Sequence, residues 1–270
     1  MTAPDPRFLA TAIEVVTHAG AIQRARFGTA VRIDKKGAID LVTEVDLEVE
    51  RAARALISAR FPDHDILAEE LGGGALGRSH RWVFDPLDGT TNFAHGVPIF
   101  CSSLALEIDG EAVVGAVFDP NRQELFTTER GVGAWLNGVP LHTSTTASLI
   151  DALLVTGFPY DVHSTLDEVI GLFAAYVSQS RAVRRLGSAA IDLCWVAAGR
   201  MDGFWEERLQ PWDTRAGALL VQEAGGRVTG LDDGPWDPAA GHILASNGPL
   251  HGELQRVADG FRDRRRNGTA

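Results

Sequence analysis

The sequence has few of the residues that several common site chemistries require. Of its 270 residues only two are cysteine, Cys101 and Cys194, and neither belongs to a Cys-x-x-Cys pair. This scarcity excludes a disulfide framework, a zinc ribbon and a dithiol redox site. The eight histidines never fall within five residues of one another, which excludes a zinc helix of the His-Glu-x-x-His type.

Motifs that bind nucleotides or activate a serine are also absent. The sequence contains no Gly-Lys pair, so it has no P-loop, and it has no Gly-x-Ser-x-Gly elbow. The triple glycine Gly72–Gly74 lacks the spacing of a dinucleotide-binding turn. We interpret it as a flexible loop.

Long apolar runs and an excess of positive charge are missing as well. No run approaches the ~18 apolar residues of a spanning helix, and the first residues do not resemble a signal peptide. We therefore expect a cytoplasmic protein without a membrane partner. The net charge of −11 argues against direct binding to nucleic acid and favours cations as partners. The basic tail 261–270 is expected to be frayed and solvated.

The first half of the chain, residues 1–143, is predicted to be an α+β unit. Asp5 followed by Pro6 predicts the start of an amphipathic helix, and Thr-Glu-Val-Asp at 43–46 has the form of a capping box that starts a second. Asp-Gly at 109–110 and Asn-Gly at 137–138 predict hairpin turns, so we expect an antiparallel sheet flanked by helices. The strands are expected over 65–69, 81–85, 101–108, 111–118, 124–128, 134–136 and 139–142.

The second half, residues 144–270, alternates strand and helix patterns, which is typical of an α/β unit. No low-complexity linker separates the halves, so we expect them to share a continuous core. Strands are predicted over 153–158, 182–186, 203–207, 226–230 and 242–247, and helices over 163–178, 188–199 and 212–224, with one more at the end.

The most informative segment is Asp-Pro-Leu-Asp-Gly-Thr-Thr-Asn-Phe at 85–93. A preceding apolar strand delivers Asp85 at its end, Pro86 is expected to stop the strand ladder, and Asp88 follows, so two carboxylates should converge. The backbone N–H groups of Gly89 and Thr90 could face an anion if a short helix starts there. Oxygen ligands beside such donors favour Mg²⁺ holding a phosphate, although both Asp-Pro and Asp-Gly are also ordinary turn pairs.

Further acidic residues each have an ordinary structural explanation. Glu69 and Glu70 end a predicted strand, where adjacent carboxylates repel each other unless a cation or solvent separates them. Asp46 can serve as the reciprocal residue of a capping box, and Asp213 is favoured by the dipole of the helix it starts. Taken together with Asp85 and Asp88, they favour a site for hard cations.

These residues resemble the inositol monophosphatase family, the Mg²⁺-dependent, lithium-sensitive phosphomonoesterases. The resemblance covers nearly the whole chain. Two of its matching blocks, ILAEE (66–70) and WVFDPLDGTTNF (82–93), are together highly specific. It implies the layered αβαβα sandwich of the inositol monophosphatase and fructose-1,6-bisphosphatase type, and a homodimer. The matching blocks are DLVTEVD (40–46), ILAEE (66–70), WVFDPLDGTTNF (82–93) and PWDTRAGALLVQEAGG (211–226).

The resemblance also implies the role of each site residue. Asp85 would bridge two Mg²⁺ ions, the first completed by Glu69 and the Leu87 carbonyl and the second by Asp88 and Asp213, with a third, weaker ion held through Glu69 and water. The catalytic residues would be Asp46, Thr90 and Glu69, of which Thr90 and Asp46 orient the attacking water. The substrate-binding residues would be Asp88, Gly89, Thr90, Ser188, Ala189, Glu206 and Asp213.

This assignment agrees with the chemistry of the residues. A phosphate dianion that enters a cluster of carboxylates meets repulsion of roughly 1–4 kcal/mol per close pair, so metal must bind before substrate. Metal ions can then lower the pKa of a bound water, stabilise the leaving alkoxide and neutralise phosphoryl charge, without a covalent phosphoenzyme. Asp46 is best described as an orienting base that accepts a proton from the Thr90 hydroxyl.

The choice of alcohol is expected to depend on the second half. Glu206 lies seven residues before Asp213, as does the family's hydroxyl-binding glutamate, and Ser188 and Ala189 match a loop that touches the sugar ring. Arg184 and Arg185 could contact a larger substrate, but solvated surface is the preferred interpretation. We rank myo-inositol 1-phosphate first, with fructose 1,6-bisphosphate, histidinol phosphate, 3′-phosphoadenosine 5′-phosphate and NADP as alternatives.

A function of another class remains open. Some bacterial members of the family are thought to be regulators that bind transcription or ribosome-assembly machinery. The intact set of acidic residues favours catalysis, and the acidity of the chain argues against direct RNA contact.

Overall fold

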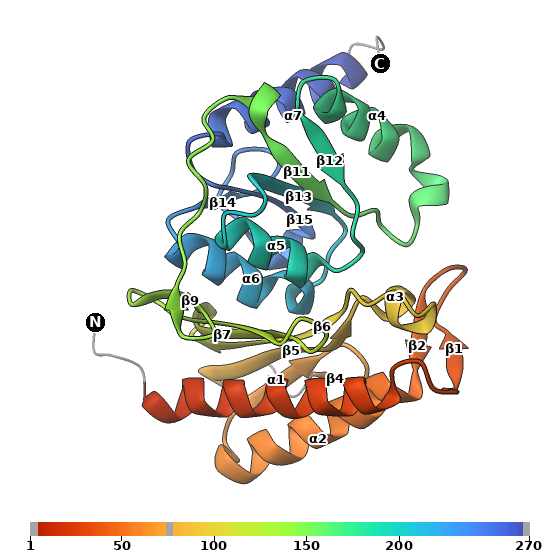
Figure 1. Ribbon diagram of the computed structural model, residues 1–270, viewed down its shortest axis with the longest axis vertical. Helices are drawn as coiled ribbons and strands as arrows, with labels where there is room; N and C mark the ends of the chain where they lie inside the picture. Colours follow the sequence, from red (N-terminus) through yellow and green to blue (C-terminus); the bar gives the residue numbers. More distant parts are fainter. Residues whose placement is uncertain (1–4, 74–77, 267–270) are drawn as a thin grey trace.

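The computed structural model describes residues 5–73 and 78–266, which form five stacked layers (Figure 1). Helices form the first, third and fifth layers, and a sheet lies between each pair of helical layers. This order confirms the predicted αβαβα sandwich. From one face of the molecule to the other, the helical layers are α1 (Pro6–Arg26) with α2 (Glu44–Arg60), α5 (Ala189–Ala197) with α6 (Pro211–Glu223), and α4 (Leu166–Val177) with α7 (His251–Arg266).

Helices α1 and α2 begin at the predicted caps. The Asp5 carboxylate accepts a hydrogen bond from Arg7 N, and Pro6 occupies the first helical position. The N–H that proline lacks would have no acceptor within the helix at that position, so proline is tolerated there. At the start of α2, the Thr43 hydroxyl accepts from Val45 N, and the Asp46 carboxylate accepts from Thr43 N at 2.9 Å. Asp46 is therefore fixed by its own helix before it contacts the site.

The large sheet has the strand order β10-β9-β8-β7-β6-β5-β3-β4. Its neighbours are antiparallel with one exception, because β3 and β5 run parallel, so the prediction of a fully antiparallel sheet is wrong for this pair. The edge strand β4 runs antiparallel to β3, and β5 again has the direction of β3. The bounds are β3 (Asp65–Ala68), β4 (Gly72–Gly73), β5 (His80–Asp88), β6 (Cys101–Ile108), β7 (Glu111–Asp119), β8 (Glu124–Glu129), β9 (Gly133–Leu136) and β10 (Val139–Pro140).

Strand β5 carries two of the predicted metal ligands and contains a bulge. Asp85 pairs with Ser103 and Asp88 with Cys101, so β5 has one residue more than β6 between the two pairs. Contrary to the prediction, Pro86 does not end the strand. It lies in the bulge, where its missing N–H is tolerated. Residues three apart point to opposite faces of a regular strand, and the extra residue restores a common direction for the two carboxylates.

Several other local predictions are wrong or incomplete. Of the triple glycine, Gly72 and Gly73 form the edge strand β4 instead of a loop, and Gly74 lies outside the described residues. The basic tail is helical as far as Arg266, because Phe261 packs its ring into the core; residues 267–270 lie outside the description. A hairpin of β1 (Ile33–Lys35) and β2 (Leu41–Thr43) was not predicted.

The second sheet has the order β12-β11-β13-β15-β14. β11 runs parallel to both of its neighbours, β12 and β13, as expected of an α/β unit, while β15 runs antiparallel to both β13 and β14. The helix predicted over 163–178 is split into a short 3-10 turn (Val162–Ser164) and α4. The bounds are β11 (Leu153–Thr156), β12 (Ala182–Arg184), β13 (Gly203–Glu207), β14 (Arg227–Thr229) and β15 (His242–Ser246).

Helices α5 and α6 join the two sheets. One buried cluster contains Val117 and Phe126 from the large sheet together with Phe204 from the small one, so the core is continuous across the halves. The helices pack closely, because a β-carbon at Gly217 would lie 2.6 Å from Leu193 Cβ. The boundary at residue 143 stays a prediction.

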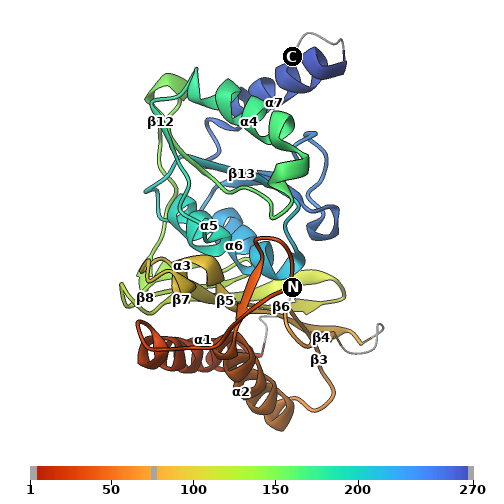
Figure 2. The ribbon, with the colours of Figure 1, turned by 90° about the vertical axis from the view of Figure 1, so that its right-hand side faces the viewer.

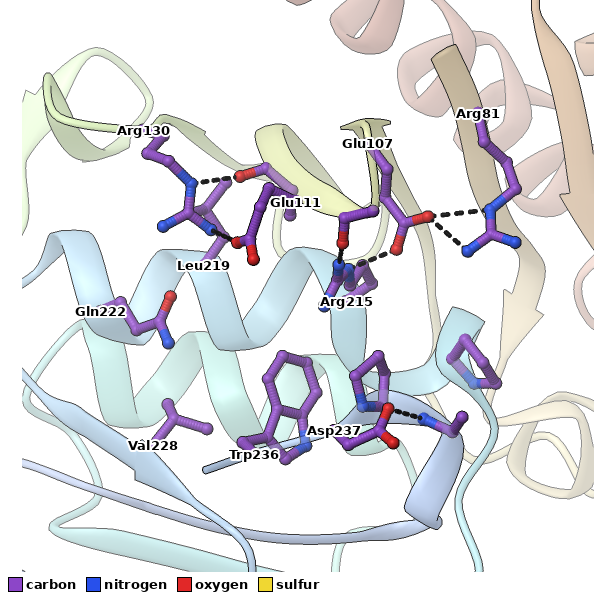
Figure 3. Close-up of a pocket in the computed structure, with 15 residues that line it drawn as sticks. Arg81, Glu107, Glu111, Arg130, Arg215, Leu219, Gln222, Val228, Trp236 and Asp237 are labelled. Carbon is purple, nitrogen blue, oxygen red and sulfur yellow. Dashed lines mark hydrogen bonds and ion pairs between the residues drawn. The ribbon is translucent and has the colours of Figure 1, made fainter. Parts of the chain in front are cut away.

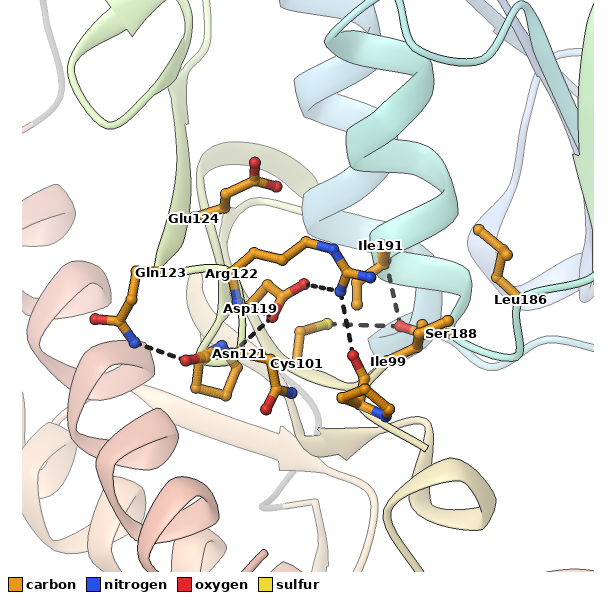
Figure 4. A network of polar contacts seen from close by, with 12 residues as sticks. Ile99, Cys101, Asp119, Asn121, Arg122, Gln123, Glu124, Leu186, Ser188 and Ile191 are labelled. Atoms are coloured by element: carbon orange, nitrogen blue, oxygen red, sulfur yellow. Dashed lines mark hydrogen bonds and ion pairs between the residues drawn. The ribbon is translucent and has the colours of Figure 1, made fainter. Parts of the chain in front are cut away.

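A polar network fixes the junction between β7 and α5 (Figure 4). Asp119 accepts hydrogen bonds from the backbone of Asn121 and from the Arg122 guanidinium, which also donates to the Pro98 carbonyl. The segment that leads into β6 is thereby held beside Ser188 at the start of α5.

Within residues 5–73 and 78–266, no helix is both long and apolar enough to cross a membrane.

His251, at the start of α7, is buried in its neutral form. Thr229 Oγ1 donates to the Gly230 carbonyl, so His251 Nε2 carries the proton toward Thr229, and Nδ1 accepts from the Ser246 hydroxyl, both at 2.9 Å. A second ring proton would require the Ser246 hydroxyl to turn from donor to acceptor. Burial and the nearby Arg227 accordingly lower the pKa of His251 to about 4.

We predict that acid weakens the fold through this residue. Because the folded-state pKa lies below the ordinary value of 6.5, the stabilisation is fully present above pH 6.5 and is lost as pH falls through 4. Between these limits the free energy of unfolding should fall by about 2 kcal/mol more in the wild type than in His251→Gln. Urea unfolding of both proteins across this range measures the difference, and a constant difference contradicts the prediction.

Candidate active site

A cavity of about 480 Å³ opens where the end of β5 meets the starts of α5 and α6. The orange β1–β2 hairpin extends toward α6 beside it (Figure 2). Every residue predicted for the site lines this cavity except Asp46, which lies directly behind it. The predicted residues that line it are Glu69, Asp85, Leu87, Asp88, Gly89, Thr90, Ser188, Ala189, Glu206 and Asp213.

Asp85 and Asp88 accept hydrogen bonds from backbone and hydroxyl donors. Asp85 Oδ1 accepts from Leu87 N across the bulge. Asp88 Oδ2 accepts from the Ser188 hydroxyl at 2.6 Å and from Ala190 N at 2.7 Å, both at the N-terminus of α5. A helix N-terminus carries partial positive charge, which favours a carboxylate there. Asp88, from the first half, is thus fixed by the second.

Asp213 enters the cavity from the first turn of α6. Pro211 occupies the first position of the helix, and Asp213 Oδ2 accepts from Gln210 N at 2.6 Å, which completes the cap. The sequence signal for this helix start is therefore genuine. It also places the carboxylate in the cavity that Asp85 and Asp88 line. The charge of Asp88 raises the pKa of Asp213, and the charge of Asp213 raises the pKa of Asp85.

The carboxyl groups of this cluster disfavour one another's charge. Burial raises the pKa of Asp85 and of Asp213 well above the ordinary value, and the neighbouring Glu69 and Asp88 raise both further. Burial also raises the pKa of Asp88 to about 6 and that of Glu206 to about 8. The protein alone therefore leaves these charges poorly compensated, and a cation in the cavity would be stabilised.

Lys36 separates Glu69 from Glu70, the adjacent carboxylates whose repulsion the sequence indicates. Its ammonium lies 2.9 Å from Glu69 Oε1 and 2.5 Å from Glu70 Oε1. Burial alone would lower the pKa of Lys36, but the two carboxylates outweigh it and raise that pKa, while burial raises the pKa of Glu70 to about 7. Sequence reasoning missed this residue, although the rarity of lysine in the chain, two in all, was an available signal.

Thr90 and Asp46 form the pair that the resemblance implies. The Thr90 hydroxyl lies 3.1 Å from Asp46 Oδ1 and 2.8 Å from the Leu87 carbonyl. A hydroxyl has one proton, so it donates to one of these acceptors at a time. Burial raises the pKa of Asp46 to about 6, against the hydrogen bonds from Thr43 and Thr90 that favour its charge.

Gly89 is the position where the backbone bends into the short helix α3 (Thr90–Ala94). Its φ of 93° lies in the left-handed region, and a β-carbon there would lie 2.8 Å from the Ile99 carbonyl. Glycine is therefore required at this position on two counts. The predicted short helix at Thr90 is confirmed.

The far end of the cavity contains Glu206 and the residues around it. The Glu206 carboxylate lies against Gly157, where a β-carbon would be 2.2 Å from either oxygen. The Ser188 hydroxyl donates to Asp88, and the predicted contact of Ser188 with a sugar ring stays a prediction. Arg184 and Arg185 are both exposed, in agreement with solvated surface, but Arg185 also lines the cavity and lies over the Phe158 ring.

Tyr160 and Asp40 also line the cavity and were not predicted. Tyr160 is 55% exposed. Partial burial and the nearby carboxylates, first Asp40 and then Glu69, raise the pKa of its phenol. The available signal was the Gly-Phe-Pro-Tyr loop at 157–160, which leaves the carboxyl end of a parallel strand, where α/β proteins bind ligands.

The donor chemistry of the cavity fits a hard cation. Its lining contains carboxylates and carbonyls but neither histidine nor cysteine, which suits Mg²⁺ better than zinc. Among the described residues, no group of three or more His, Cys, Asp or Glu side chains already stands in an arrangement that could hold an ion. The assignment of individual ligands therefore stays a prediction.

Comparison with known proteins identifies the family. The model of the inositol monophosphatase family matches residues 6–262. The inositol-1-monophosphatase of Synechocystis is 48% identical over 252 residues, 93% of this chain and 88% of that protein. The Nus factor SuhB of Pseudomonas aeruginosa is 46% identical over 222 residues, 80% of this chain and 82% of that protein. The solved structure of inositol monophosphatase from Anabaena superposes with a TM-score of 0.85 at 42% identity. The match covers 93% of this chain and 94% of the Anabaena chain. The chain therefore belongs to the inositol monophosphatase family and is a phosphoric monoester hydrolase.

Proposed function

We propose that the protein hydrolyses myo-inositol 1-phosphate to myo-inositol and phosphate, with Mg²⁺ and by direct attack of water. One observation carries the proposal. Glu69, Asp85, Asp88 and Asp213 line one cavity together with the Leu87 carbonyl and the Gly89–Thr90 backbone. Oxygen ligands and amide donors that share a cavity suit a metal-bound phosphate.

The proposed metal ligands are Glu69, Asp85, Asp88, Asp213 and the Leu87 carbonyl, with Asp85 shared between two ions. When bound, Mg²⁺ would acidify a water molecule and neutralise charge on the phosphoryl oxygens and the leaving alkoxide. The raised pKa values of Asp85 and Asp213 support this assignment, because a cation would relieve the repulsion that raises them. Inhibition by Li⁺ belongs to the same proposal.

Thr90 and Asp46 are proposed to orient the attacking water. With Asp46 ionised, the Thr90 hydroxyl donates to Asp46 Oδ1 and leaves its lone pairs to accept a proton from water. The Asp46 carboxylate cannot reorient freely, because Thr43 N and the Thr43 hydroxyl both donate to its other oxygen. The base is therefore fixed in position before substrate arrives.

Glu206 is proposed to select a polyol. Its carboxylate lines the end of the cavity and can accept hydrogen bonds from two hydroxyl groups. The Synechocystis relative, an inositol-1-monophosphatase by name, supports inositol as the ring. Fructose 1,6-bisphosphate, histidinol phosphate, 3′-phosphoadenosine 5′-phosphate and NADP are the alternative substrates. A cytoplasmic homodimer is part of this proposal.

A second candidate is a regulatory role in transcription or ribosome assembly. The observation that favours it is the Pseudomonas aeruginosa relative, which is named a Nus factor. The net charge of −11 favours a protein partner over direct contact with RNA. This role can coexist with catalysis.

Phosphate release from the five candidate substrates tests the proposal. We expect release that requires Mg²⁺, disappears with EDTA, falls with Li⁺ and is fastest with myo-inositol 1-phosphate. Another preferred substrate would keep the chemistry and change the alcohol. Absence of release from every substrate, by protein shown to be folded, would place the regulatory role first.

Asp46→Asn is expected to lower kcat about 10²–10⁴-fold, because general-base assistance contributes a factor of that order. The Mg²⁺ concentration for half-maximal activity should change little, since Asp46 is not a proposed ligand. The asparagine can still accept from Thr43 N, so circular dichroism should show an intact fold. Full turnover at saturating Mg²⁺ would remove Asp46 from the mechanism.

Glu206→Gln is expected to raise KM for myo-inositol 1-phosphate about 10-fold, because the amide keeps one acceptor oxygen but loses the second hydrogen bond to a ring hydroxyl. Hydrolysis of p-nitrophenyl phosphate, which has no ring hydroxyls, is the matched control and should change less than about threefold. Equal losses on both substrates would contradict a role for Glu206 in recognising the alcohol.

A further inference from the structure

A chain of ion pairs joins β5 to α6 through Glu107 on β6 (Figure 3). Glu107 Oε2 accepts from Arg81 Nε at 2.8 Å and from Arg81 Nη2 at 2.6 Å. Its other oxygen, Oε1, lies 2.5 Å from Arg215 Nε on α6. One carboxylate therefore binds two guanidinium groups from two different layers of the molecule.

The Arg215 end of this chain is buried and has several contacts. The Glu107 side chain is 2% exposed and that of Arg215 is 9% exposed. The Arg215 guanidinium also donates to the Gly110 carbonyl and lies 5.6 Å from the centre of the Trp236 ring. A buried pair that loses one partner leaves an uncompensated charge, so Arg215 is costly to remove.

The two arginines lie close in sequence to the acidic cluster. Arg81 precedes Asp85 by four residues on β5, and Arg215 follows Asp213 by two residues on α6. Two residues correspond to about 200° around a helix, so Arg215 and Asp213 point to opposite sides of α6. The ion pairs hold one side of the helix on the large sheet while the other side presents Asp213 to the cavity.

Apolar residues of α6, among them Ala216 and Leu220, also pack against the large sheet in the cluster that contains Val117. Arg215 adds a directional, polar attachment two residues from Asp213. The hydrogen bond from Gln210 N to Asp213 lies within the start of α6 and moves with the helix. At the opposite end of α6, Gly131 N donates to Glu223. Across residues 5–73 and 78–266, Arg215–Glu107 is the one ion pair found between α6 and the large sheet.

We propose that Arg215 is a positioning residue, which through Glu107 fixes the first turn of α6 and thereby sets where Asp213 lies relative to Asp85 and Asp88. The inference rests on the proposed function, in which these three carboxylates hold Mg²⁺. Its consequence is that Mg²⁺ affinity depends on an arginine that does not line the cavity.

The test is Mg²⁺ binding to Arg215→Met, measured by isothermal titration calorimetry without substrate and by the Mg²⁺ dependence of phosphate release. Methionine has a similar length and removes both the charge and the guanidinium contact with Trp236. We expect the Mg²⁺ dissociation constant to rise about five- to tenfold. Changes to groups that hydrogen-bond to metal ligands weaken metal binding about 10- to 100-fold, and Arg215 acts less directly, through the position of the helix. kcat at saturating Mg²⁺ should stay within about threefold of the wild type.

Arg200→Met is the matched control. Arg200 also forms an ion pair between the halves, with Glu124, and also lies over a tryptophan, Trp195, but it is not on α6. It should lower thermal stability without changing the Mg²⁺ dissociation constant. Arg215→Leu, which likewise cannot pair with Glu107, is measured by the same criteria if the methionine variant does not fold.

The outcomes separate the inference from the function on which it rests. An unchanged Mg²⁺ dissociation constant in the folded Arg215 variant, or an equal rise in Arg200→Met, overturns the positioning role while the proposed function stands. A wild type that neither binds Mg²⁺ nor releases phosphate overturns the proposed function, and the inference with it. A rise confined to the Arg215 variant supports both.

Discussion

Repulsion among buried carboxylates is the constraint on which this structure depends. Asp85, Asp88 and Asp213 are brought together in a cavity where burial alone disfavours their charge. The fold offsets this cost with dipoles: Asp88 accepts from the start of α5, and Asp213 accepts from the start of α6. The cluster is thereby held in place yet remains short of positive charge, which is the condition a cation-binding site requires.

The cavity belongs to neither half alone. Asp88 comes from a strand of the large sheet but is fixed by Ser188 at the start of α5. Asp213 comes from α6, whose opposite side is attached to the large sheet through Glu107. The continuous core around α5 and α6 makes this exchange possible, because two domains on a flexible tether could not hold such side chains in register.

Local signals in the sequence were sufficient for much of this architecture. The caps at Asp5 and Thr43 begin their helices, and the Asp-Gly and Asn-Gly turns have the positive φ angles that hairpins demand. The direction of β3 relative to β5 was not predictable, because it depends on an edge strand of two glycines. The ammonium of Lys36 was missed for a related reason, since the hairpin that delivers it has exposed β1 residues and no apolar pattern.

The contact between Glu206 and Gly157 limits how this cavity can diversify. The floor beneath the carboxylate is main chain, and any side chain at Gly157 would occupy the space of the glutamate itself. A side chain at Gly157 would therefore displace the Glu206 carboxylate, so a new alcohol can be accommodated without moving that carboxylate only by changes in the walls. Tyr160 and Arg185, which lie on connecting segments, are the wall positions free to vary, so new specificities can arise without disturbing the acidic cluster.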